Sequence, residues 1–439
     1  MARRPIAAAY LQSIPEAMES LVPVRLFENL RVHGNTWWTP KQLLLASALM
    51  SWREEKLLTS RFETVRELLA NMLNAQSIPA SYTGYAEALA RWMPRLLTPL
   101  VAHFQREVRR LAGERWKTSG WVVFAADGSR FEAPRTQANE TVLKCAGKLK
   151  TAPQVFQTAL MHLGTNALWD FRLGPGTASE RRHLEDMARS LPPQSLVVAD
   201  AGLIGYELCV RLMNSGVSFL LRVGGNVTLL AEHWGTKIIR GGQIVWLWPF
   251  QVRTLPPLPL RLIALKKRNR TVYLVTNVLD PERLTRKQAG LIYQQRWRIE
   301  ILFRSLKQTW ERSRWRSRVP RTVLAEQIST LLGFWIQQLL SYREFVKSTT
   351  DVRLWSPARA LNSTRRMLRR ALQGTFQVSH WLEDIGTAIR DRYVRRRSKH
   401  SRTWPRQKHD PPISPPRLRT LTARLGNQGR RQLAAQNTE

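Results

Sequence analysis

The sequence predicts an α/β protein, and three observations carry this prediction. Residues 121–126 and 195–199 are short apolar runs with the length and composition of buried strands. An aspartate follows each run directly, where α/β proteins generally place ligand-binding side chains. Stretches with the periodicity of amphipathic helices lie before, between and after the two runs. The chain has 439 residues, which is enough for two or three domains.

The composition narrows the class of protein. The formal net charge is +37, so we expect a polyanionic partner, and nucleic acid is favoured over a membrane surface. Apolar residues make up 43% of the chain, which excludes a fully disordered protein. No apolar run has membrane-spanning length and no apolar signal core follows Met1, so we expect a cytoplasmic protein without membrane contact. Cys145 and Cys209 are the only cysteines and lack the spacing of a metal site.

The sequence patterns in the first 115 residues predict helices and no strands. Thr39 is a helix cap followed by Pro40 at the first helical position, and amphipathic patterns recur at residues 62–73 and 85–111. We therefore expect a helical N-terminal domain over residues 1–115. It either contacts DNA ends or only braces the rest of the protein.

The next segment predicts alternating strands and helices. Its order is three strands, a helix, a strand, a helix and a strand, at residues 121–126, 154–163, 166–173, 180–191, 195–199, 206–213 and 218–223. This is the order of a ribonuclease-H-like α/β domain that still lacks its last helix, which carries an acid.

That helix is predicted only at residues 285–310, after a β-rich insertion over residues 224–285. The insertion thus divides a catalytic domain of residues 116–223 and 286–345. Residues 346–389 predict a C-terminal helical region. Residues 390–439 contain fourteen Lys or Arg against three Asp or Glu, together with five prolines. This composition predicts a basic, flexible tail that either binds DNA or is only solvated.

One face of the predicted helix 285–310 is polar. Its residues lie at offsets of 0, 3, 7 and 14 and are Tyr293, Arg296, Glu300 and Lys307. At 3.6 residues per turn these offsets correspond to roughly 0°, −60°, −20° and −40°, while apolar residues gather on another flank. The row is either a solvated face with an Arg296–Glu300 pair or a metal-binding glutamate bordered by phosphate-binding groups.

The two strand-end aspartates favour the second interpretation. Asp127 and Asp200 are expected at the carboxyl edge of the sheet, within reach of Glu300 from the packed helix. Hard divalent ions prefer such carboxylates together with phosphate oxygens. Two ions about 3.5–4 Å apart can clamp the attacking and leaving oxygens of a phosphoryl displacement. The predicted reaction is hydrolysis or transesterification of a phosphodiester.

These residues resemble a known family. A Tyr, Arg, Glu, Lys signature with two, three and six intervening residues marks the DDE transposases of the bacterial insertion-sequence 4 family, and the polar row matches this spacing at every step. Asp127-Gly128-Ser129 and Asp200-Ala201-Gly202-Leu203 resemble the two aspartate blocks of the family. Leu203 departs mildly from the family pattern, because an aromatic residue is commoner there.

The resemblance implies roles for single residues. Asp127, Asp200 and Glu300 would bind two Mg²⁺ ions, for which Mn²⁺ could substitute, and would form the catalytic triad. Other residues would bind DNA at the transposon end, namely Tyr293, Arg296, Lys307 and Trp297. Trp297 would lie near a distorted end base or would pack against a neighbouring element. Tryptophans of the insertion would help to shape a hairpin intermediate, and they are Trp234, Trp246 and Trp248.

The resemblance therefore implies a cut-and-paste DNA transposase. Its partners would be double-stranded transposon ends and target DNA, and it would act as a homodimer on DNA in the bacterial cytoplasm, associated with the nucleoid. Two alternatives remain. One is a ribonuclease-H-like nuclease without strand transfer. The other is a catalytically silent, transposase-derived DNA-binding protein, although the presence of Asp127, Asp200 and Glu300 speaks against it.

Overall fold

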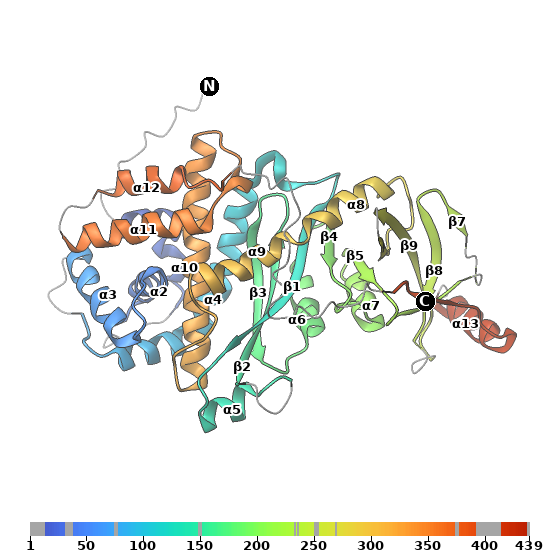
Figure 1. Ribbon diagram of the computed structural model, residues 1–439, viewed down its shortest axis with the longest axis horizontal. Coiled ribbons are helices and arrows are strands. Elements are labelled where there is room, and N and C mark those ends of the chain that lie inside the picture. The colour runs from blue at the N-terminus through green and yellow to red at the C-terminus, as the bar shows by residue number, and fades with distance from the viewer. Residues whose placement is uncertain are drawn as a thin grey trace, which may run out of the picture.

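The molecule is elongated, with helices at one end and a sheet that runs from its middle to the other end (Figure 1). The structure is a computed structural model. It describes residues 14–30, 38–73, 78–147, 152–231, 234, 237–249, 254–267, 270–373, 377–391 and 414–436.

The described helices occur along the whole sequence, and the longest of them lie before residue 113 and after residue 319. They are α1 (Ile14–Leu21), α2 (Pro40–Trp52), α3 (Leu58–Leu73), α4 (Tyr82–Ala112), α5 (Gln137–Leu143), α6 (Glu180–Ala188), α7 (Tyr206–Asn214), α8 (Arg286–Gln295), α9 (Arg298–Arg304), α10 (Pro320–Lys347), α11 (Pro357–Leu372), α12 (Val378–Gly386) and α13 (Ala423–Gln436). None of these described helices is long and apolar enough to cross a membrane.

The described strands lie between residues 122 and 276, with one more near the C-terminus. They are β1 (Val122–Glu132), β2 (Gln154–His162), β3 (Ala167–Pro175), β4 (Ser195–Ala199), β5 (Ser218–Val223), β6 (Thr228–Leu230), β7 (Ile238–Ile239), β8 (Gly242–Leu247), β9 (Leu258–Lys267), β10 (Arg270–Thr276) and β11 (Arg417–Arg419).

The helical end of the molecule is assembled from distant parts of the sequence. Helix α2 begins as predicted, with a capping box on Thr39 and a proline in its first turn. The long, buried helix α10 packs against α2, α4 and α12. The Trp52 indole donates a hydrogen bond to the Gly333 carbonyl at 3.0 Å, and the Ser329 hydroxyl donates to the Ser47 carbonyl at 3.1 Å. The helices predicted in 1–115 and 346–389 thus share one core.

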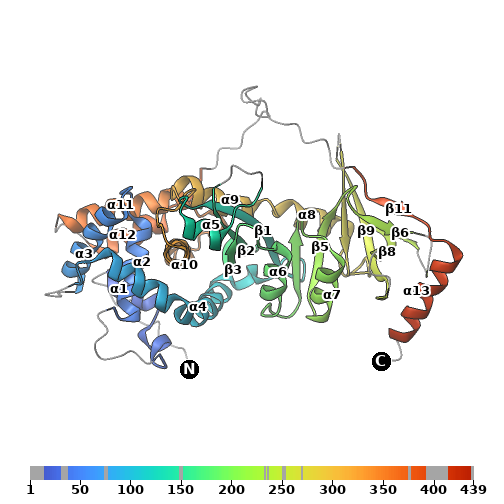
Figure 2. The ribbon, with the colours of Figure 1, turned by 90° about the horizontal axis from the view of Figure 1, so that it is seen from below.

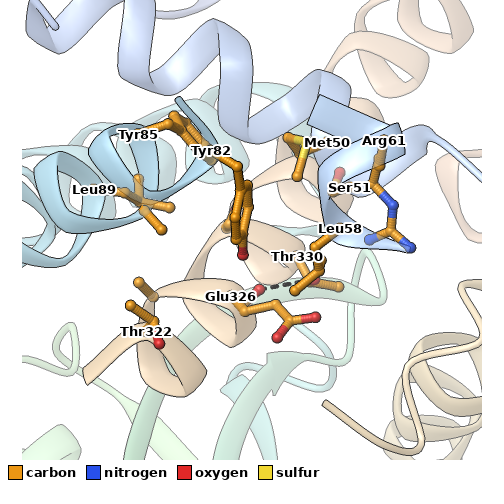
Figure 3. Close-up of a pocket in the computed structure, with 13 residues that line it drawn as sticks. Met50, Ser51, Leu58, Arg61, Tyr82, Tyr85, Leu89, Thr322, Glu326 and Thr330 are labelled. Atoms are coloured by element: carbon orange, nitrogen blue, oxygen red, sulfur yellow. Dashed lines mark hydrogen bonds between the residues drawn. The ribbon is translucent and has the colours of Figure 1, made fainter. Parts of the chain in front are cut away.

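A small polar cavity lies where α3 and α4 meet α10. Figure 3 shows the Tyr82 hydroxyl pointing toward Glu326, with Arg61 on the neighbouring helix. The cavity measures about 30 Å³, which is room for one water molecule. The Glu326 carboxylate accepts hydrogen bonds from the Ser317 amide at 3.3 Å and hydroxyl at 3.1 Å. Burial and then the charge of Glu326 raise the pKa of Tyr82 to about 12, so the phenol is neutral at pH 7.

The predicted order of strands and helices between residues 121 and 223 is present. β1 pairs antiparallel with β2, and β2 antiparallel with β3, whereas β1 pairs parallel with β4, and β4 parallel with β5. One boundary was wrong. β1 does not end before Asp127 but continues to Glu132, because β2 pairs with it along this whole length.

The insertion continues the same sheet. The apolar alternation at residues 243–248, 260–265 and 271–276 predicts three strands there, and β8, β9 and β10 confirm them. β10 pairs antiparallel with β5, so the sheet runs β11-β6-β8-β9-β10-β5-β4-β1-β2-β3, with β7 beside β8. The insertion is therefore an extension of the catalytic sheet rather than a separate layer.

Part of the predicted flexible tail is folded. Within 390–439, residues 392–413 and 437–439 lie outside the described residues, but β11 pairs with β6 and α13 packs beyond it (Figure 2). A small apolar cluster holds α13 in place. It consists of Leu230, Trp246 and Trp248, with Trp234, Leu421 and Leu433 packed against it. The Trp234 indole donates to the Gly426 carbonyl at 2.8 Å. The prediction of a flexible tail is wrong for these residues because their apolar side chains have a partner surface.

The contact between α13 and the insertion can be tested at Gly429. A Cβ atom at this position would lie 2.2 Å from the Trp234 ring. Overpacking of this kind destabilises a folded protein by about 1–3 kcal/mol. We expect Gly429→Ala to release α13 and to speed tryptic cleavage after Arg430 several-fold, as measured by limited proteolysis. Gly84→Ala is the control, because no described atom lies closer than 3.8 Å to its Cβ position. Equal cleavage rates in both variants would contradict the packing described above.

Candidate active site

Asp127 and Asp200 lie side by side because β1 and β4 pair in parallel. Ala125 pairs with Val198, and the same register two residues further on brings Asp127 opposite Asp200. Neighbouring strands are about 4.8 Å apart. β5 adds Arg222 on the other side of Asp200, and its guanidinium donates a hydrogen bond to the Asp200 carboxylate at 3.4 Å.

The helix predicted at residues 285–310 is interrupted twice. α8 begins at Arg286 with a capping box on Thr285 and ends at Gln295, α9 covers Arg298–Arg304, and a π-helical turn follows at Ser305–Thr309. At the first interruption, the Arg296 amide donates to the Tyr293 carbonyl and the Ile299 amide to the Arg296 carbonyl, each at 3.1 Å. These bonds span three residues, which tightens the chain without ending its right-handed coil.

Arg296 is surrounded by the predicted acids. Its guanidinium donates to the Glu300 carboxylate at 3.1 Å and lies 3.9 Å from an Asp200 oxygen. The Tyr293 hydroxyl donates to Asp200 at 3.3 Å. Burial lowers the pKa of Arg296, but the net shift is upward because Tyr293 and the charges of Asp200, Asp127 and Glu300 act against it. Burial and then the charge of Asp200 raise the pKa of Tyr293 to about 12.

Asp127 completes the group. Burial is the main reason why its pKa is raised, and the charges of Glu300 and Asp200 add to the shift. The Gly128 amide, which donates to Asp127 at 2.9 Å, and the charge of Arg296 oppose it. Asp127, Asp200 and Glu300 are therefore close enough to interact electrostatically around one guanidinium.

A fourth carboxyl group in the site was missed by sequence reasoning. Glu180 is the first residue of α6. Its Oε1 lies 2.7 Å from the position of a Cβ on Gly128, and the Phe156 ring lies 2.6 Å from it, so residue 128 has no room for a side chain. Burial and the charge of Asp127 raise the pKa of Glu180 to about 7. Only the pairing of β1 with β2 and the position of α6 bring this residue to the site, and neither is visible as a local pattern.

Two predicted DNA-binding residues lie away from the acids. The Lys307 ammonium lies 5.0 Å from the centre of the Phe131 ring at the far end of β1, and burial lowers its pKa while Glu132 acts against this. Trp297 caps α9 and its side chain is 49% exposed. The two differ in accessibility, because Lys307 is half-buried and Trp297 is open to a partner.

The donor set fits a divalent metal in type. Among the described residues, no three His, Cys, Asp or Glu side chains are arranged closely enough to bind an ion as they stand. Arg296 lies between Glu300 and Asp200 and supplies the positive charge at this point. The carboxylate oxygens of Asp127, Asp200 and Glu300 are nevertheless the ligands that hard divalent ions prefer.

Comparisons with known proteins identify the class. A family model described as a transposase DDE domain matches residues 119–332. The chain is 25% identical over 314 residues to the transposase InsG for insertion sequence element IS4 of Escherichia coli (strain K12), which covers 65% of this chain and 67% of that protein. A solved structure of piggyBac transposase, a synaptic complex with hairpin DNA, matches 89% of this chain and 86% of that chain with a TM-score of 0.39 and 12% identity. A TM-score this low supports no conclusion.

The matched region carries the two aspartates and the glutamate described above. Residues 119–332 therefore form a transposase DDE domain, and the chain is an enzyme that acts on DNA. The Escherichia coli relative narrows the similarity further, to transposases of the insertion-sequence 4 type.

The raised pKa of Glu180 makes stability depend on pH. The folded pKa of about 7 exceeds the ordinary value of 4.5, so the fold loses stability as the pH rises from about 4.5 to about 7. Glu180→Gln removes this loss. In metal-free buffer we expect the variant to match wild type near pH 4 and to exceed it near pH 8 by on the order of 1–3 kcal/mol, as followed by thermal unfolding. Glu207→Gln, an exposed acid on α7, is the control, and a pH-independent difference for Glu180→Gln would refute the prediction.

Proposed function

We propose that the chain cuts and rejoins DNA at transposon ends, with Asp127, Asp200 and Glu300 as the catalytic acids. One observation carries this proposal, namely that the parallel pairing of β1 with β4 and the position of α9 bring the three acids together around Arg296. The strand order β3-β2-β1-β4-β5, with helices on the sheet, also supports a ribonuclease-H-like catalytic domain of residues 116–223 and 286–345.

DDE transposase domains generally use divalent metal ions. In this chain Asp127, Asp200 and Glu300 would hold Mg²⁺, or Mn²⁺ in its place. When bound, two such ions would polarise the scissile phosphate and stabilise charge on the attacking and leaving oxygens.

The chain's own cations would position the DNA strand. Arg296 is only 12% exposed and already directed at the acids, so a phosphate beside them would accept hydrogen bonds from its fixed guanidinium. Arg222 holds Asp200 from the opposite side, and the neutral Tyr293 phenol donates to the same carboxylate. The exposed Trp297 indole would stack on a base of the distorted transposon end. Lys307 would bind a phosphate further along the strand, near Phe131.

The charge distribution supports double-stranded DNA as the substrate, since a net charge of +37 favours a polyanion. We propose that transposon ends and target DNA both bind, that the protein acts as a homodimer on DNA, and that it associates with the nucleoid. Helices of residues 1–115 and 346–389 would contact the DNA ends, and the basic residues of 390–439 would add affinity. A hairpin intermediate belongs to the same proposal. Because Trp246 and Trp248 are buried beneath α13, Trp297 is the better candidate for contact with an unstacked base.

The catalytic role of the aspartates can be tested directly. Asp127→Asn or Asp200→Asn should lower Mg²⁺-dependent nicking by at least about a thousandfold, because several kcal/mol of charge stabilisation is lost. The melting temperature should not fall, since removing one acid relieves repulsion. The assay uses a supercoiled plasmid that carries the inverted repeats flanking the gene, and Asp280→Asn is the control. Nicking at the wild-type rate would remove the residue from the site, and wild-type nicking without joined donor–target product would indicate a nuclease.

Arg296 separates a structural role from a catalytic one. If it only pairs with Glu300, Arg296→Gln costs roughly 0.2–0.5 kcal/mol and leaves cleavage nearly intact. If it binds a phosphate near the scissile bond, the loss is about tenfold to a hundredfold. We expect at least about a tenfold loss of end cleavage, and the same for Lys307→Ala. Arg286→Gln, at the start of α8, is the control, and wild-type cleavage in both test variants would restrict the site to the acids.

A further inference from the structure

A second cationic site lies on another flank of the helix that carries Glu300. A cavity of about 300 Å³ is enclosed by α9, the π-helical turn after it, α10, and the segment that leads into α11. This volume is at the small end of the range for ligand pockets, roughly 300–1,000 Å³, and suits a group no larger than one nucleotide. Four arginines line it, and no carboxylate does. They are Arg298, Arg304, Arg353 and Arg390, and we call this space the arginine cavity.

The positive charge of the arginine cavity is largely uncompensated. Within the described residues, no carboxylate lies within 4.0 Å of the guanidinium groups of Arg298, Arg304 or Arg390. Arg353 pairs with Asp351, but the same carboxylate also pairs with Arg115 at 3.2 Å. The pKa of Arg298 is lowered by burial first and then by the charges of Arg353 and Arg390, while the charge of Asp351 opposes this shift.

The start of a helix also borders the cavity. The first turn of α11 forms another part of the wall, through Pro357 and Ala358, and helix N-termini favour anions. The backbone of Arg390 is held beside the cavity, because its amide donates to the Leu354 carbonyl at 2.7 Å.

The cavity shares a wall with the active site. Arg298 and Arg304 belong to α9, as does Glu300, and Arg304 lies about one helical turn after Glu300. Arg304 and Arg390 are exposed at the mouth, whereas Arg298 and Arg353 are half-buried further in. A DNA strand that ran from the acids along α9 would reach the exposed arginines at the mouth of the cavity before the half-buried ones.

We propose that the arginine cavity binds a backbone phosphate of the DNA strand. This phosphate would be a different one from the phosphate at the catalytic acids. The proposal rests on the proposed function for the identity of the polyanion. Guanidinium groups are suited to it because their planar donors match phosphate oxygens in pairs. Four guanidinium groups that share a single carboxylate repel one another, and an anion that joined them would relieve this repulsion.

The test removes the two arginines that make no ion pair at the mouth. Binding of a labelled duplex is measured by fluorescence anisotropy without divalent metal, over a range of salt concentrations. For Arg304→Gln combined with Arg390→Gln, we expect about tenfold weaker binding near 0.1 M salt, and a slope of log affinity against log salt that is smaller by about 0.9, the value of one phosphate contact. Replacing both by lysine should restore the slope, because the slope counts charges.

Arg189→Gln combined with Arg211→Gln is the matched control, since both residues are exposed, the same charge is lost, and neither lies in a segment proposed to contact DNA. Equal slopes in the two double variants would overturn the proposal. A second outcome would also overturn it. In this outcome, inorganic phosphate at constant ionic strength raises the melting temperature of wild type but not of the cavity variant, while the salt slope of duplex binding is the same for both. The site would then bind a free anion rather than DNA. The proposed function fails separately, if Asp127→Asn still nicks DNA.

Discussion

The parallel pairing of β1 with β4 is the constraint on which the site depends. It brings together Asp127 and Asp200, which are distant in sequence, and the next parallel pair adds Arg222 beside them. Carboxylates gathered in this way repel one another and lose solvation, as the raised pKa of Asp127 shows. Arg296 offsets this cost, because its guanidinium reaches both Glu300 and Asp200. The sheet thus brings mutually repelling carboxylates together, and Arg296 from the helical segment packed on it supplies the compensating positive charge.

Sequence reasoning succeeded where local pattern and fold agree. β4 and β5 were predicted at their observed bounds, because a strand buried on both faces is a continuous apolar run that a turn ends. The end of β1 was misjudged for the opposite reason. Asp127-Gly128-Ser129 has the composition of a turn, but β2 holds these residues extended, and Gly128 is needed for the space that Phe156 and Glu180 occupy.

The remaining errors arise from long-range packing. Lys307 was placed in the polar row on the assumption of a uniform helix, and the π-helical turn at Ser305–Thr309 shifts it toward Phe131. Glu180 carries no distinguishing neighbours in sequence, so only tertiary structure brings it to Asp127. Helix α13 was hidden by the charge and proline content around it, although Leu421 and Leu433 fit the tryptophan cluster of the insertion.

The strand β11 has a consequence for how copies of this chain meet in solution. A sheet that ended at β6 would present open backbone amides and carbonyls, on which a second molecule could add a strand. β11 occupies that position, is only three residues long, and carries Arg417 and Arg419 with exposed side chains. The positive charges on such an edge strand repel the same strand of a second molecule. This strand therefore protects a large, open sheet against edge-to-edge aggregation. At the opposite edge, α4 packs against β3 and limits access to it.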